Sequence, residues 1–183
     1  EGEIYIGCAG GIGTKAYLSY KLKDTPKNRF WFKVSVRGLR GGHSGSDIDK
    51  GLGNANKILA RFLYPLTQGK YGLMLSEIHG GNLHNAIARE AHAVVGVKEK
   101  HKEDIRVRLN TFLADVQNEY KDIDPGLDIQ LETVPAPAKS IKKSTTRKLI
   151  QSLCACPHGV IGMSRDIPGL VETSTNLASI KMI

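Results

Sequence analysis

His43 lies in a glycine-rich stretch, GLRGGHSGSD (38–47), between a strand-like run and a helix-like run. Glycines on both sides let the backbone approach another surface and leave the imidazole free to project. An imidazole held this way can donate a hydrogen bond to the oxyanion that develops on a carbonyl during acyl transfer. A loop histidine that merely faces solvent fits the local sequence equally well. His43 is therefore a candidate catalytic residue with an open alternative.

A second stretch, HGGNLHNAIARE (79–90), also carries more polar side chains and glycines than a connection between strands needs. The amide of Asn85 can contact a substrate carbonyl or carboxylate, and Arg89 can pair with a carboxylate. Asparagine in a turn more often caps its own backbone, which is the competing interpretation. We take Asn85 and Arg89 as candidate substrate-binding residues.

Other catalytic patterns are missing from the sequence. It contains no His-x-Asp pair, no H-E-x-x-H helix, no Glu-Glu dipeptide, no G-x-G-x-x-G and no G-x-S-x-G. The three cysteines, Cys8, Cys154 and Cys156, are too few and wrongly spaced for a disulfide framework. Cys154, Cys156 and His158 have a spacing that is unusual for zinc ligands. Their position at the end of a predicted helix is the better interpretation. We expect no metal site, and a chain that is catalytically incomplete.

The composition is that of a soluble globular protein, with 183 residues, 40% hydrophobic and 24% charged. A net charge of +8 raises the possibility of a nucleic-acid binder, but the basic residues are dispersed. Their densest run, 138–148, has no aromatic residue to stack on bases, so we expect no nucleic-acid partner. No apolar run approaches the ~20 residues of a membrane span. The acidic opening and strand-like ending suggest an excised part of a larger protein, and the cysteine usage suggests a reducing, cytoplasmic setting.

Hydrophobic periodicity predicts the elements. Alternating runs at 15–23 and 29–37 predict a hairpin, and a helical stripe starts at an N-cap, Ser46, and runs to Leu66. The further predicted elements are strands at 73–78, 90–97 and 126–134, a helix at 105–120, a stiff linker at 135–139, a third helix near 145–154 and a last strand at 170–183. The order from 29 to 134 is that of an α+β, ferredoxin-like antiparallel sheet with two helices on one face. An N-terminal hairpin strand and a C-terminal helix and strand would extend it.

Three stretches carry a resemblance to a known family: GLRGGHSGSDIDKGLGNANKILARFL (38–63), GGNLHNAIAREA (80–91) and GLVETSTNLASI (169–180). They resemble the aminoacyl-histidine dipeptidases, also called Xaa-His dipeptidases or peptidase D. These are co-catalytic zinc exopeptidases related to carnosinase and carboxypeptidase G. The likeness runs over most of the chain.

The resemblance implies an arrangement of domains. In this family a lid domain is inserted into a two-zinc catalytic domain. Residues 1–13 would then be the junction with the catalytic domain, 14–135 the lid core, and 136–183 a lid extension that returns to the catalytic domain. Both zinc ions and the general base would lie outside this chain, so the chain alone is expected to hold no catalytic zinc and to be inactive.

The resemblance also implies roles. In dimeric relatives, the histidine matched by His43 reaches into the partner subunit's active site and stabilises the tetrahedral intermediate. Asn85 matches a lid asparagine that contacts substrate, although Ala88 replaces the proline typical of relatives. Arg89 is added on charge and position alone. The implied protein is a cytosolic zinc dipeptidase acting on dipeptides with a C-terminal histidine; whether its lid forms a homodimer or works within one chain stays open.

Two other functions compete with this one. The chain could be a free-standing ferredoxin-like binding or regulatory module without catalytic activity. The encoded residues flanking Glu1 and Ile183 discriminate, since a His-x-Asp, a Glu-Glu pair and a late histidine would favour the enzyme. A basic nucleic-acid binder would instead show selective, steeply salt-dependent binding.

Overall fold

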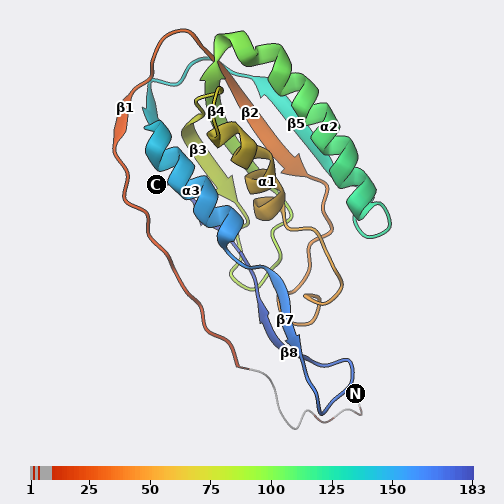
Figure 1. The fold of residues 1–183 in the computed structure, drawn as a ribbon. Coiled ribbons are helices and arrows are strands. Elements are labelled where there is room, and N and C mark those ends of the chain that lie inside the picture. The colour runs from red at the N-terminus through yellow and green to blue at the C-terminus, as the bar shows by residue number, and fades with distance from the viewer. Residues whose placement is uncertain (1, 3, 5–9) are drawn as a thin grey trace.

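The computed structural model describes residues 2, 4 and 10–183, so most of the expected junction, including Cys8, lies outside the described residues. The core elements are β2 (Arg29–Arg37), α1 (Ala55–Thr67), β3 (Met74–Gly80), β4 (Ala91–Lys98), α2 (Lys102–Tyr120) and β5 (Asp128–Thr133). The strands lie in the order β3-β4-β2-β5, and every neighbouring pair is antiparallel. Both helices cover one face of the sheet (Figure 1). The predicted α+β, ferredoxin-like fold is confirmed.

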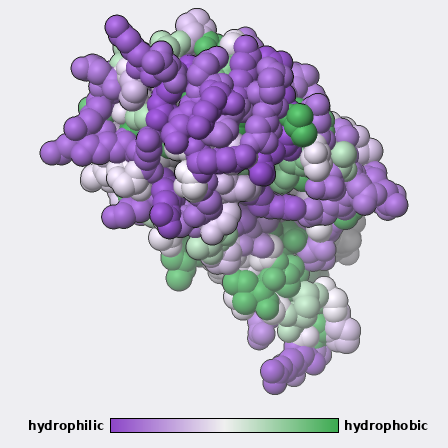
Figure 2. Space-filling view, turned by 45° about the horizontal axis from the view of Figure 1, so that its top comes forward, coloured by the Kyte–Doolittle hydropathy of each residue, from purple (hydrophilic) through white to green (hydrophobic). Residues whose placement is uncertain are grey.

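The rest of the chain extends this core. The additional elements are β1 (Leu22–Asp24), a short 3-10 turn at Glu99–His101, β6 (Lys139–Ile141), α3 (Lys143–Ala155), β7 (Gly159–Met163), β8 (Val171–Thr175) and β9 (Ile180–Lys181). β6 joins the sheet beside β3, and α3 packs beside α1. β7 and β8 pair with each other as a separate hairpin that projects from the body (Figure 1). Figure 2 shows hydrophobic residues on this projecting part.

Alternation along β2 builds the core. Phe30, Phe32, Val34 and Val36 are each 3% exposed or less and face the helices. The apolar stripe of α1 packs against them through Ile58, Leu59, Phe62, Leu63 and Leu66. Burial of one such side chain stabilises the fold by about 1.5–3 kcal/mol. The sheet and α1 therefore pack together through the apolar faces that the sequence pattern predicted.

Trp31 lies on the other face of β2 and is still only 2% exposed. Its cross-strand neighbour on β4 is Gly96. A Cβ at Gly96 would come within 2.6 Å of the indole Cε2, so the missing side chain leaves room for the ring to lie flat on the sheet. The alternating pattern placed Trp31 on the correct face without indicating its burial.

The predicted N-terminal hairpin is wrong in its pairing. Residues 14–21 form no strand and are almost entirely exposed, and β1 pairs with β6 instead of β2. The reason is that β2 already has β4 on one edge and β5 on the other. Alternation indicates that a segment can form a strand, but it does not identify the edge that receives it.

The predicted start of the first helix is also wrong. Asn54, not Ser46, is the N-cap, and its side chain accepts hydrogen bonds from the amides of Asn56 (2.9 Å) and Lys57 (3.3 Å). Residues 44–51 form successive turns, and Gly51 has a φ of +69°, which a helix does not tolerate. Farther on, the predicted last strand is divided into β8 and β9, and β7 is a strand that the sequence pattern did not predict.

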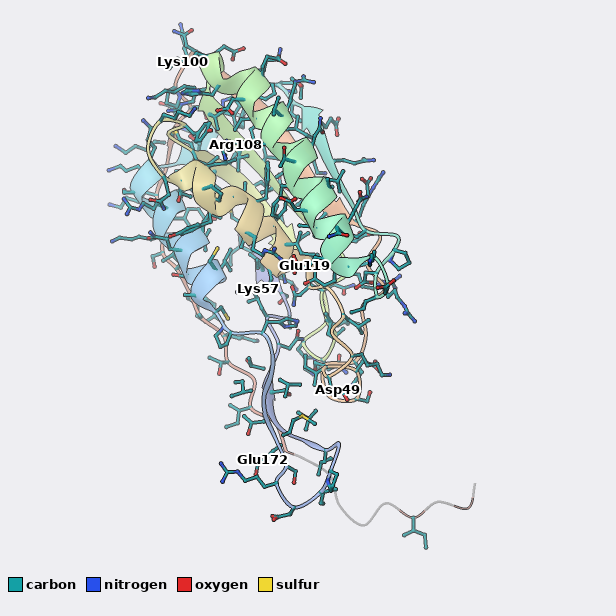
Figure 3. All side chains as sticks on the ribbon, turned by 45° about the vertical axis from the view of Figure 1, so that its right-hand side comes forward. Asp49, Lys57, Lys100, Arg108, Glu119 and Glu172 are labelled. Carbon is teal, nitrogen blue, oxygen red and sulfur yellow. The ribbon has the colours of Figure 1, made fainter. Side chains whose placement is uncertain are left out.

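Lys57 joins α1 to the end of α3 (Figure 3). Its Nζ donates to the carbonyls of Leu153 (3.0 Å), Cys154 (2.7 Å) and Cys156 (2.6 Å). A cation at a helix C-terminus satisfies unpaired carbonyls and opposes the negative end of the helix dipole. Within residues 2, 4 and 10–183, none of the helices combines the length and apolar character needed to cross a bilayer.

Candidate functional site

The two loops singled out in the sequence lie against each other. The amide of Ser44 donates to the carbonyl of Asn85 (2.9 Å), and the amide of Ile87 donates to the carbonyl of Gly42 (2.8 Å). Between these bonds, His43 and Ala86 face each other as an antiparallel bridge. The fold therefore brings His43 and Asn85 side by side, and both are exposed.

The imidazole of His43 is held by its own loop. Its Nδ1 accepts hydrogen bonds from the amides of Gly45 (3.1 Å) and Ser46 (3.3 Å). Because a backbone amide can only donate, Nδ1 must be the acceptor, and the neutral ring carries its proton on Nε2. A Cβ at Gly45 would lie 3.2 Å from the ring, so glycine allows the close approach. The loop thus sets His43 up as a hydrogen-bond donor through Nε2.

Asp47 closes the inner part of the loop. Its Oδ2 accepts from the amide of His43 (2.7 Å), and its Oδ1 accepts from the Nζ of Lys50 (2.5 Å). The hydrogen bond from Lys50, followed by that from the His43 amide, holds the pKa of Asp47 below its ordinary value. The carboxylate is therefore ionised at neutral pH and continues to hold the backbone of His43.

Asp124, which lies outside this loop in the sequence, joins the two ends of the loop. This residue follows α2 and is 1% exposed. Its Oδ1 accepts from the amide of Arg40 (2.7 Å), and its Oδ2 accepts from the amide of Gly53 (2.7 Å). Nearby, Gly38 has a φ of +77°, and a Cβ there would lie 1.9 Å from the carbonyl oxygen of Gly126. Asp124 does not stand out in the sequence, where its only local signal is an Asp before a Pro-Gly turn.

The turn that carries Asn85 is held from the other side by asparagines. Asn176 donates through Nδ2 to the carbonyl of Ala86 (2.8 Å). Asn56, which is fully buried, donates through Nδ2 to the carbonyl of Leu177 (3.1 Å). The segment before β9 therefore lies between the start of α1 and the turn. These asparagines were not predicted as site residues, although both lie in stretches that carried the family resemblance.

Arg89 also reaches the His43 loop. Its Nε donates to the carbonyl of Leu39 at a long 3.4 Å. Its stem packs on Gly41, where a Cβ would come within 2.2 Å of Cγ, and the φ of +62° at Gly41 suits glycine. In the structure, Arg89 therefore contacts and supports the loop that carries His43. Its predicted contact with substrate stays a prediction.

The side chains present do not fit a pair of zinc ions. Across the described part of the chain, no group of three or more His, Cys, Asp or Glu side chains is gathered to hold a metal. Cys154 Sγ donates to the carbonyl of Ala60 (3.4 Å), beside the end of α3. His158 Nδ1 lies 3.3 Å from Nδ2 of Asn54, in a hydrogen bond of its own. Zinc ligands for a catalytic centre would have to come from other residues.

Residues 27–124 match a family model described as the peptidase dimerisation domain, M20_dimer. The chain belongs to this family. The matched range begins just before β2 and ends at Asp124, so it contains the ferredoxin-like core up to α2 together with both loops of the site.

Two relatives agree with this assignment. The chain is 38% identical over 182 residues to the cytosol non-specific dipeptidase of Escherichia coli (strain K12), covering 100% of this chain and 37% of that protein. Its structure is similar to the crystal structure of aminoacylhistidine dipeptidase from Vibrio alginolyticus, with a TM-score of 0.86 and 33% identity over 91% of this chain and 34% of the other. The chain spans about a third of the length of these two relatives. The chain therefore resembles the lid, or dimerisation, domain of these two dipeptidases.

Proposed function

We propose that the chain is the lid of a zinc-dependent cytoplasmic dipeptidase, closing over dipeptide substrates and contributing His43 and Asn85 to the site. The observation that carries the proposal is the backbone pairing of the two loops, which brings these residues together. The dipeptidase relatives and the dimerisation-domain family support it. The proposal includes two zinc ions, with ligands outside residues 1–183, a catalytic domain as the first partner, and a homodimer formed through the lid.

The proposed role of His43 is to bind the oxyanion of the tetrahedral transition state. The Nε2 proton would be donated to the carbonyl oxygen as negative charge develops on it. Because the amides of Gly45 and Ser46 already fix Nδ1, the donor needs little reorganisation when the reaction occurs. Such an interaction is stronger in the transition state than in the ground state, so it acts on kcat more than on KM.

Asn85 and Arg89 have proposed roles in holding the substrate. The amide of Asn85 would contact a carbonyl or the terminal carboxylate of the dipeptide, and Arg89 would contribute positive charge. A C-terminal histidine is the proposed preference. The names of the two relatives differ on this point, since one is a non-specific dipeptidase and the other an aminoacylhistidine dipeptidase.

The test is hydrolysis of β-alanyl-histidine by the full-length enzyme with zinc. We expect His43→Ala to lower kcat about 100-fold or more, with little change in KM. Asp49→Ala is the matched control, because Asp49 is an exposed side chain of the same loop (Figure 3). Equal activity of wild type and His43→Ala would show that His43 takes no part in the mechanism. An inactive wild type would contradict the proposed dipeptidase activity.

Substrate preference is measured with the same enzyme on β-alanyl-alanine. A C-terminal histidine preference predicts a kcat/KM at least about 10-fold higher for β-alanyl-histidine. A ratio near one would indicate a non-specific dipeptidase and would leave the proposed roles of His43 and Asn85 unaffected.

A further inference from the structure

The loop that carries His43 meets the body of the protein at one buried carboxylate. The two oxygens of Asp124 accept the amides of Arg40 and Gly53, both at 2.7 Å. These amides belong to opposite ends of the loop, so a single side chain fixes the distance between its ends. Hydrogen bonds to an ionised acceptor are shorter and stronger than those between neutral groups.

The surroundings of Asp124 make this link rigid. The amide of Asp124 donates to the carbonyl of Tyr120 (2.8 Å), and its carbonyl accepts from the amide of Leu127 (3.0 Å). Its backbone is thereby bound to the last turn of α2 and to the start of β5. A Cβ at Gly53 would lie 3.2 Å from Oδ2, so glycine leaves the carboxylate room to reach the backbone. The side chain has little freedom to move away from the loop.

Asp124 is also connected, through the start of α1, to the turn that carries Asn85. Gly53 directly precedes Asn54, the N-cap of α1, and the amide of Ala55 donates to the carbonyl of Ala88 (2.9 Å) in the Asn85 turn. Asp124 therefore fixes the loop of His43 relative to the same helix start that holds the turn of Asn85. A change at Asp124 would move His43 relative to its neighbour without touching either side chain.

We propose that Asp124 is the positioning residue of the His43 loop, holding Nε2 of His43 at the place where the transition state needs a donor. This inference rests on the proposed function. Asp124 would not touch the substrate. It would act through His43 alone, and this distinguishes it from a residue that only stabilises the fold.

Asp124→Asn is the informative variant because it keeps the shape of the side chain. One oxygen can still accept an amide, but the new Nδ2 faces the other amide donor to donor. Asp122→Asn is the matched control, because it removes one negative charge from an exposed position in the same turn. Both are made in the full-length enzyme, with and without His43→Ala.

The expected result has two parts. In the enzyme with His43, Asp124→Asn lowers kcat about 10-fold or more with KM nearly unchanged, because a displacement of about 1 Å is costly to catalysis. In the His43→Ala background it lowers kcat by less than about 2-fold, because the two residues act as a unit. Hydrogen exchange of residues 39–53 rises, while that of β4 does not change.

Each outcome decides the question. If Asp124→Asn lowers kcat equally in the enzyme with His43 and in His43→Ala, the positioning role is wrong. Unchanged hydrogen exchange of residues 39–53 would also overturn it. Neither result would contradict the proposed dipeptidase activity. An inactive wild type would contradict the proposed function and this inference with it. Loss in the His43 enzyme alone, with Asp122→Asn close to wild type, supports the inference.

Discussion

The imidazole of His158 is half-buried beside the start of α1. Nδ1 lies 3.3 Å from Nδ2 of Asn54, and since the amide nitrogen donates, the ring accepts and is neutral in this arrangement. Burial, and then the positive charge of Lys57, lower the pKa of His158 from its ordinary value of 6.5. The folded protein therefore resists protonation of this residue.

This lowered pKa makes stability depend on pH. Below pH 6.5 the unfolded chain binds a proton at His158 before the folded chain does. The contribution to stability is thus fully present above that value and is lost as the pH falls through the lowered pKa. When the pH is lowered from about 7.5 to about 5.5, we expect the free energy of unfolding to fall less in His158→Gln than in wild type. Urea unfolding of the full-length protein at each pH measures this difference. An identical pH dependence in both proteins would contradict this account.

The sequence singles out some candidate site residues and not others, for a physical reason. His43 and Asn85 stand out locally, because glycines and polar side chains cluster around each of them. Asp124 and Asn176 do not, because they act on backbone groups 71 to 90 residues away. A residue whose partners are backbone atoms of distant segments leaves no pattern in its own neighbourhood.

The start of α1 is the element on which both loops converge. The Asn54 side chain caps the helix through Oδ1, while its Nδ2 donates to the carbonyl of Leu177 (3.1 Å). Because Asn54 is 2% exposed, water cannot replace these bonds.

We expect Asn54→Ala to lower the free energy of unfolding by about 2 kcal/mol, from the lost cap and the unpaired carbonyl together. Urea unfolding of the full-length protein measures this change. Asn110→Ala, at an exposed position inside α2, is the control and should be neutral or slightly stabilising. Equal effects of the two substitutions would show that the cap contributes nothing.

Element types were easier to predict than their ends and partners. The core strands and α2 follow from periods of 2 and 3.6, because one face of each packs on the same core. The pattern from Ser46 continued the apolar stripe of α1 backward, yet the chain there turns around the carboxylate of Asp47. A polar side chain that binds local backbone can override a helical pattern.

The chain spans about a third of the length of its two relatives. Under the proposed function, in which both zinc ions are bound by residues outside 1–183, we expect this chain alone to release no histidine from β-alanyl-histidine, even with added zinc. Amino-acid analysis of the reaction mixture checks this, with the full-length enzyme as the positive control. Zinc-dependent hydrolysis by the chain alone would place the catalytic centre within it.

The distant anchoring of the His43 loop also bears on how the protein is made. Asp124 follows Arg40 by 84 residues, and Asn176 follows Ala86 by 90. A ribosome adds roughly 5–20 residues per second, so each loop emerges several seconds before the residue that fixes it. During that interval the two ends of the His43 loop are not yet joined by the carboxylate of Asp124. A product terminated before Asp124 would therefore contain the His43 loop without the side chain that joins its two ends.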